Sequence, residues 1–241
     1  LQLNSGSTFE NIVGGSGNDV LSGNLLNNVF TGNAGNDTLN GAAGNDSLFG
    51  GLGDDTYVFG TASSSEADTV TEGTNQGTDT LSFVSLTTAV TLDLTKSIVQ
   101  SVHTNRTLQL NSGSTFENIV GGSGDDVLTG NLLDNSFTGN AGNDTLTGAA
   151  GNDSLFGGLG DDTYVFGTAS SVEADKVTEG TNQGTDSLVF ESLTTAVTLN
   201  LTKSIVQSVH TNRTLQLNSG NTFENIVGGS GDDVLTGNLL D

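Results

Sequence analysis

Nine aspartates hold the same place in a repeated stretch of nine residues. Residues 14–58 read GGSGNDVLS, GNLLNNVFT, GNAGNDTLN, GAAGNDSLF and GGLGDDTYV, and the sixth position is Asp in four of these five units. The block returns at 121–165 and begins again at Gly228. The aspartates are Asp19, Asp37, Asp46, Asp55, Asp126, Asp144, Asp153, Asp162 and Asp233. Carboxylate and turn carbonyl oxygens are the ligands that a hard divalent cation such as calcium takes.

Aspartate is also a common turn residue, because its side chain hydrogen-bonds nearby backbone. That role explains one or two turns, whereas here the same carboxylate recurs in nine units. If successive turns stack at roughly 4.8 Å, neighbouring carboxylates repel each other by roughly a few kcal/mol per pair. A divalent cation between them would turn this repulsion into a cross-link, so we favour metal ligation over plain turn formation.

The other positions of the unit describe the element that must carry these aspartates. Gly and Asn at positions 1, 2 and 4 permit a tight turn, and the residues after the aspartate form a three-residue strand with one inward side chain. That inward residue, at position 8, is Leu21, Phe30, Leu39, Leu48 and Tyr57 in the first block. Such short strands form a core only when stacked, at about 18 residues for each rung of two turns and two strands.

This pattern, G-G-x-G-x-D-x-U-x with U apolar, resembles the RTX (hemolysin-type) calcium-binding nonapeptide repeat. The resemblance implies an all-β fold, a calcium-binding parallel β-roll or β-solenoid with several Ca²⁺ ions per long repeat. It also implies that each ion lies between turns n and n+2, which stack on one edge. We call the edge of Asp19, Asp37, Asp55 and their copies Asp126, Asp144, Asp162 the first edge.

The second edge departs from the pattern. Asn28 stands where an aspartate belongs, Leu26 replaces the second turn glycine, and Asn135 and Leu133 repeat the defect. Asp46 and Asp153 stay in the predicted ligand set, but we expect the sites that they share with the asparagines to be weak or absent.

A longer period of 107 residues encloses the nonapeptide blocks. Residues 1–107 and 108–214 differ at 11 of 107 positions, and residues 215–241 begin a third copy. Each full copy contains a nonapeptide block (14–58, 121–165) and a spacer (59–107, 166–214), and nonapeptides restart at 228. We expect the chain to be a window from a longer array.

The spacers keep a looser form of the same pattern. Asp68 and Asp79 precede apolar residues as in the nonapeptides, but they lie 13 and 11 residues after the preceding aspartate. We therefore leave Asp68, Asp79, Asp175 and Asp186 outside the predicted ligand set. We interpret the spacers as β rungs with wider loops, the alternative being a separate small β-domain per repeat. The basic stretch 95–106 is expected to pair Lys96, His103 and Arg106 with acidic neighbours on these loops.

Composition excludes several classes of function. The chain has 28 acidic and 5 basic residues and a net charge of −23, which excludes nucleic-acid binding through phosphates. No run of apolar residues is long enough to span a membrane. There is no cysteine for disulfides or thiolate sites. With only 33% hydrophobic residues, we expect the chain to stay largely disordered at micromolar calcium and to fold at millimolar calcium.

The leading hypothesis is a non-enzymatic structural role: a calcium-stabilised segment of a bacterial surface fibre, adhesin stalk or matrix filament. The resemblance implies secretion and an extracellular location, because RTX proteins are exported unfolded by type I secretion. Exposed strand edges would also permit self-association into filaments, end to end or laterally, and Phe49 and Phe156 at the outward position 9 are candidates for lateral contact. The main alternative is the secretion and folding module of a toxin or hydrolase. An ice-binding row of Thr145, Thr147 and Thr163 is a third, which a thermal-hysteresis assay would test.

Overall fold

The computed structural model describes residues 9–74, 76–180, 183–220 and 222–240. Residues 1–8, where the first long copy begins, lie outside this part. The described chain is all-β, as predicted, and contains no helix that could cross a membrane. It forms two compact units, one of residues 1–86 with 91–120 and the other of residues 87–90 with 121–241.

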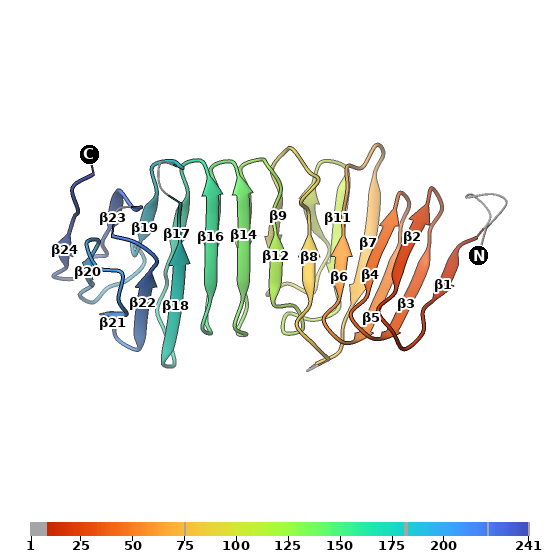
Figure 1. Ribbon diagram of the computed structural model, residues 1–241, viewed down its shortest axis with the longest axis horizontal. Helices are drawn as coiled ribbons and strands as arrows, with labels where there is room; N and C mark the ends of the chain where they lie inside the picture. The colour runs from red at the N-terminus through yellow and green to blue at the C-terminus, as the bar shows by residue number, and fades with distance from the viewer. Residues whose placement is uncertain (1–8, 75, 181–182, 221, 241) are drawn as a thin grey trace. The chain divides into compact units, whose positions relative to one another are not determined.

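Short strands make up the first unit, and all but one belong to its two sheets (Figure 1). They are β1 (Asn11–Val13), β2 (Val20–Asn24), β3 (Val29–Ala34), β4 (Thr38–Ala42), β5 (Ser47–Leu52), β6 (Thr56–Val58), β7 (Glu66–Thr71), β8 (Thr80–Ser82), β9 (Thr91–Asp93), β10 (Gln100–His103), β11 (Arg106–Leu110) and β12 (Asn118–Val120). One sheet has the order β1-β3-β5-β7-β11-β10, and the other contains β2-β4-β6-β8-β12. Through the nonapeptide block, successive strands therefore alternate between two sheets.

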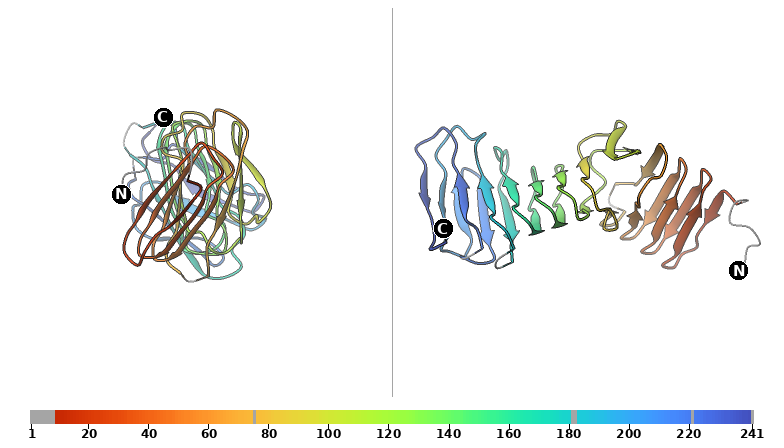
Figure 2. Two further views of the ribbon diagram at one scale, coloured as in Figure 1. Left: turned by 90° about the vertical axis from the view of Figure 1, so that its right-hand side faces the viewer. Right: turned by 90° about the horizontal axis from the view of Figure 1, so that it is seen from above.

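The second unit repeats this plan. Its strands are β13 (Val127–Thr129), β14 (Ser136–Ala141), β15 (Thr145–Thr147), β16 (Ser154–Leu159), β17 (Thr163–Val165), β18 (Glu173–Thr178), β19 (Ser187–Val189), β20 (Thr198–Asn200), β21 (Gln207–His210), β22 (Arg213–Leu217), β23 (Asn225–Val227) and β24 (Val234–Thr236). One sheet contains β14-β16-β18-β22-β21, another contains β13-β15-β17-β19-β23, and β20 pairs with β24. In the right-hand view of Figure 2 the strands of each unit lie side by side.

The inward residues form two apolar ladders in each unit. In the first unit one ladder aligns Leu21, Leu39, Tyr57, Leu81 and Ile119, residue against residue, between parallel strands. The position-8 residues of the two complete blocks are buried, from 0% exposed at Leu39 to 7% at Leu21, whereas Leu235 in the third copy is 38% exposed. The prediction that position 8 points inward is confirmed for these two blocks, and burial of their side chains supplies the core that a single short strand lacks.

The turns need glycine where neighbouring rungs approach closely. Gly35 has φ of 114°, and a Cβ there would meet the backbone of Gly17, one rung away. Positive φ and backbone contact together exclude larger residues at this position.

The spacers continue both sheets of their units. In the first unit β7 pairs in parallel with β5, and β8 pairs in parallel with β6, so these spacer strands extend the sheets of the nonapeptide block. The spacer also contains one departure from the parallel prediction, because β10 and β11 pair antiparallel around a turn in which Asn105 has φ of 61°. The same hairpin, β21–β22, occurs in the second unit. A two-residue turn reverses the chain too sharply for a crossover to a parallel strand.

The hairpin places the basic stretch differently from the prediction. Lys96 pairs with Asp93 at 3.0 Å and is half exposed, in agreement with the expected pairing. Arg106, however, begins strand β11 instead of lying on a wide loop, and only 2% of its surface is exposed. Of the two phenylalanines at the outward position 9, Phe49 is 37% exposed, whereas Phe156 is half-buried.

Candidate metal centre

Hydrogen bonds join the first-edge aspartates from one rung to the next. The backbone N–H of Asp19 donates to Oδ1 of Asp37, and that of Asp37 donates to Oδ1 of Asp55, both at 2.7 Å. In the second unit the bonds run from Asp126 to Asp144 and from Asp144 to Asp162, again at 2.7 Å. The structure therefore brings the predicted residues of this edge into one column of carboxylates in each unit.

The column continues into the spacer. The N–H of Asp55 donates to Oδ1 of Asp79 at 2.9 Å, and the N–H of Asp79 donates to Oε2 of Glu117 at 2.8 Å. Bonds from Asp162 to Asp186 and from Asp186 to Glu224 repeat this in the second unit. Asp79 and Asp186, which the prediction left outside the ligand set, thus lie in the columns, because strand pairing restores the register and the additional residues are accommodated in the loops.

Each column retains carboxylate oxygens without a hydrogen bond. Among the described residues, the Oδ2 atoms that are buried and have no partner belong to Asp37, Asp46, Asp55, Asp79, Asp144, Asp153 and Asp162. These side chains are at most 2% exposed. A buried ionised carboxylate oxygen is costly unless a cation or a donor faces it. The donor set thus fits a cation that accepts carboxylate oxygens, as calcium does.

Backbone carbonyls lie beside these oxygens. A Cβ added to Gly139 would overlap Oδ2 of Asp144 and approach the carbonyl oxygen of Gly157 on the next rung. Gly32 has the same surroundings, Asp37 and the Gly50 carbonyl, in the first unit. Glycine at position 1 therefore leaves room for carboxylate and carbonyl oxygens to converge.

We expect Gly139→Ala to destabilise the calcium-bound chain by about 1–3 kcal/mol, because the methyl group displaces the Asp144 carboxylate. The midpoint of calcium-induced folding should rise several-fold. Gly167→Ala is the matched control, since a Cβ at Gly167 would meet no atom within 4 Å, and its effect should stay within about 0.5 kcal/mol. Thermal unfolding at fixed calcium measures both, and equal effects of the two substitutions would contradict the steric argument.

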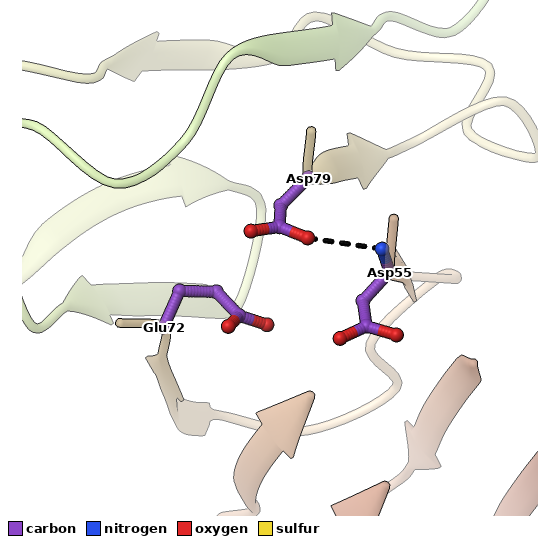
Figure 3. A group of neighbouring side chains, drawn as sticks. All are labelled: Asp55, Glu72 and Asp79. Carbon is purple, nitrogen blue, oxygen red and sulfur yellow. Dashed lines mark hydrogen bonds between the residues drawn. The ribbon is translucent and has the colours of Figure 1, made fainter. Parts of the chain in front are cut away.

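Three carboxylates converge where the nonapeptide block meets the spacer (Figure 3). Asp55, Glu72 and Asp79 each place one carboxylate oxygen within 4.8 Å of the others, and all three side chains are buried. The second unit repeats the cluster with Asp162, Glu179 and Asp186. We call these the carboxylate triads. Three converging carboxylates are the strongest arrangement for a divalent cation among the described residues.

Glu72 is held in this position by hydrogen bonds. The hydroxyl of Tyr57 donates to Oε1 of Glu72 and accepts the N–H of Gly50 at 2.6 Å. The side-chain amide of Asn111 donates to the Glu72 carbonyl at 2.6 Å and accepts its N–H at 3.0 Å. Tyr57 thus contributes both to the core and to the orientation of a triad carboxylate.

Burial is the main cause of the raised pKa values of the triad carboxyl groups. It raises the pKa of Asp55 to about 6, that of Glu72 to about 7 and that of Asp79 to about 8, and neighbouring carboxylates add to each shift. In the second unit the pKa values are about 7 for Asp162, 8 for Glu179 and 6 for Asp186, with the same main cause. Near neutral pH the three groups of a triad therefore ionise together only at a cost that a bound cation would offset.

Glu72 and Glu179 were missing from the predicted ligand set, although an alignment of spacer and nonapeptide could have found them. Strand pairing sets Val70 against Leu48 and Thr71 against Phe49. Extending this register by one residue sets Glu72 against Gly50, the position-1 glycine of the last unit. The spacing of nine, on which the prediction relied, does not reach this residue.

We expect the double substitution Glu72→Gln/Glu179→Gln to remove about one bound calcium per copy, or to weaken that ion roughly tenfold or more. The matched control is Asp54→Asn/Asp161→Asn, which makes the same change in net charge at exposed neighbours of the triads. Equilibrium dialysis of calcium gives the stoichiometry. If the two double substitutions lower the number of bound calcium ions equally, then net charge, and not the geometry of the triads, governs binding.

The second edge differs from the first. The N–H of Asn28 donates to Asp46 Oδ1 at 2.7 Å, and the N–H of Asp46 donates to Asp68 Oδ1 at 3.0 Å, so Asp68 also belongs to a column. Burial raises the pKa of Asp46 to about 7, which the nearby Arg106 opposes. Asp153 repeats this arrangement with Asn135 and Asp175. Asp233, in the third copy, is half-buried and accepts the N–H of Val197 at 2.8 Å.

Comparison with known families gives one match. The model described as the RTX calcium-binding nonapeptide repeat (4 copies) matches residues 5–25, 22–57, 112–132, 129–164 and 218–239. No curated protein matches this chain. All nine predicted aspartates lie inside the matched ranges, whereas Glu72 and Asp79 lie outside them.

Proposed function

Because the chain belongs to the family of RTX calcium-binding nonapeptide repeats and so binds Ca²⁺, we propose that each unit is a calcium-binding β-roll that folds as the ions bind. We further propose that it serves as a structural, non-catalytic segment of a secreted bacterial fibre, adhesin stalk or matrix filament. In this proposal the ligands of the first edge are the nonapeptide aspartates together with the carboxylate triads.

The observation that carries the proposal is the buried, unpartnered Oδ2 of the first-edge aspartates. Asp37, Asp55 and Asp79 are 0–1% exposed, and their Oδ1 atoms already accept backbone N–H groups. At neutral pH a cation between rungs would use the remaining oxygens without changing the backbone. Asp144 and Asp162 repeat this arrangement in the second unit, which supports a module whose stability depends on calcium.

Near-identity of the long copies supports a role in providing length. Copies that differ at 11 of 107 positions provide the same structure again and again, which suits a stalk or filament. At roughly 4.8 Å per rung and about six rungs, each copy would add about 28 Å.

Chains with two, four and six long copies test this role. We expect their contour length in millimolar calcium, measured by electron microscopy, to increase by a constant step near the estimated 28 Å. In EDTA the regular step should disappear. Lengths that do not increase with copy number would overturn the stalk proposal while leaving calcium binding intact.

The second candidate is the secretion and folding module of a toxin or hydrolase. The family match favours it, because RTX repeats occur in proteins exported by type I secretion. A lipase, protease or toxin domain encoded in the same gene would decide for this candidate.

A further inference from the structure

One arginine in each copy lies buried among acidic side chains. Nη1 of Arg106 pairs with Asp68, and Nη2 pairs with Glu66 at 2.7 Å. All three side chains are only 2–3% exposed. Arg213 makes the same two ion pairs, with Asp175 and Glu173, in the second unit. The β10–β11 hairpin brings Arg106 next to Glu66, which lies 40 residues earlier in the chain. The contact is therefore tertiary, and the copy of the hairpin repeats it in the second unit.

The guanidinium also faces backbone oxygens. Nη2 of Arg106 lies 3.3 Å from the carbonyl oxygen of Gly60 and 3.5 Å from that of Ala42. Ala42 is the second residue of the nonapeptide that contains Asp46. Arg106 therefore contacts two carboxylates and turn carbonyls, which are the kinds of oxygen that calcium takes in a nonapeptide site.

Asp46 connects this cluster to the second edge. Its N–H donates to Asp68, the residue that Arg106 pairs with, and its own Oδ2 is buried without a partner. In the first edge the equivalent aspartate is Asp55, whose N–H donates to Asp79. Asp46 with Asp68 on the second edge is thus equivalent to Asp55 with Asp79 on the first edge. Each pair joins the nonapeptide block to the spacer.

The two edges differ in the cation that faces these carboxylates. In the part of the chain that the structure describes, no lysine or arginine pairs with Asp55, Glu72 or Asp79, whereas Arg106 pairs directly with the second-edge cluster. Buried carboxylates require a compensating positive charge. Among the described residues, no lysine or arginine supplies this charge at the first-edge triad, whereas Arg106 supplies it at the second edge.

We propose that Arg106 and Arg213 are the built-in cations of the second edge and occupy the place that calcium takes on the first edge. The sites that Asp46 and Asp153 share with Asp68 and Asp175 then take no calcium, because the guanidinium paired with Asp68 or Asp175 supplies the positive charge there. Each copy thus joins one calcium-dependent edge to one that the protein itself neutralises. This inference rests on the proposed function, because it assumes that the first edge binds calcium.

Removing the guanidinium should convert the second edge into a calcium site. We expect Arg106→Ala/Arg213→Ala to bind one further calcium ion for each arginine removed, measured by equilibrium dialysis against wild type. Adding Asp46→Asn/Asp153→Asn to that variant should abolish the additional ions. The matched control is Lys96→Ala/Lys203→Ala, which removes the same charge from the spacers and should add no ion.

Each result decides the proposal. A folded arginine variant with the wild-type stoichiometry would overturn it, as would additional ions in the lysine control. If the alanine variant stays unfolded at every calcium concentration, calcium cannot replace the guanidinium and the proposal fails. Arg106→Lys/Arg213→Lys retains the charge and should bind as many ions as wild type, and a gain there would contradict it. If wild type itself binds no calcium, the proposed function fails first.

Discussion

Removal of calcium at pH 7 is expected to abolish most of the β-sheet signal of this chain, and millimolar calcium should restore it. The net charge is −23, and the triads place three carboxylates within 4.8 Å of one another. A typical domain is stable by only about 5–15 kcal/mol. A single site occupied at a hundred times its dissociation constant contributes about 2.7 kcal/mol, so several sites per copy together are comparable with that whole stability.

Far-UV circular dichroism during a calcium titration of metal-free protein measures this effect. We expect a cooperative transition, because the carboxylates of Asp37, Asp55 and Asp79 each accept the backbone N–H of the aspartate one rung earlier. Magnesium is the control, since it requires a small octahedral site and gives up its water reluctantly. A metal-free chain with full β signal at pH 7 would mean that the aspartates act as turn formers, and the metal assignment would fail.

Acidification of the calcium-free chain is expected to restore part of the β structure. The pKa values of Asp55, Glu72 and Asp79 are about 6, 7 and 8 in the folded state, above the ordinary 3.8 for Asp and 4.5 for Glu. A carboxyl group with a raised folded-state pKa binds protons more tightly when folded, so stability falls as pH rises. The stability is fully present below about pH 4 and is lost through pH 6–8.

In calcium the dependence on pH should reverse, because protons then compete with the ion for the same oxygens. Thermal unfolding of metal-free and calcium-loaded protein between pH 4.5 and 8 measures both curves. The sequence pI of about 4.1 means that acid also reduces net repulsion. A variant with all six triad residues changed to Asn or Gln separates protonation of the triads from the general reduction of net charge. If the triads are the cause, this variant should lose most of the dependence of stability on pH. Metal-free stability that increases from pH 5 to 8 would show that the triads are not the cause.

The nonapeptide part of the fold could be predicted from the sequence because its spacing is regular. Period nine places one apolar residue per strand, so Leu39 and Leu48 could be assigned to the core, and both are buried. The same period placed Asp37 and Asp55 on one edge, where a hydrogen bond now joins them. Local chemistry and repetition were sufficient for these residues.

The spacer residues could not be placed in this way, because their position depends on strand pairing over long distances. Asp79 lies 24 residues from its hydrogen-bond partner Asp55, where the regular separation is 18. Arg106 reaches Glu66 only after a hairpin reverses the chain. Loops of variable length leave no periodic signal, and only the register of the paired strands restores the alignment.

The parallel stacking of rungs also determines how one unit would respond to mechanical force. A pull along the stack loads the rungs one after another, so they would peel off singly instead of sliding past each other together. Each rung of 18 residues would release about 60 Å of extended chain. An ion shared by adjacent turns would have to dissociate at every step. The force needed to unfold each rung would therefore increase with the calcium concentration, and such a unit would dissipate mechanical energy in steps that calcium controls.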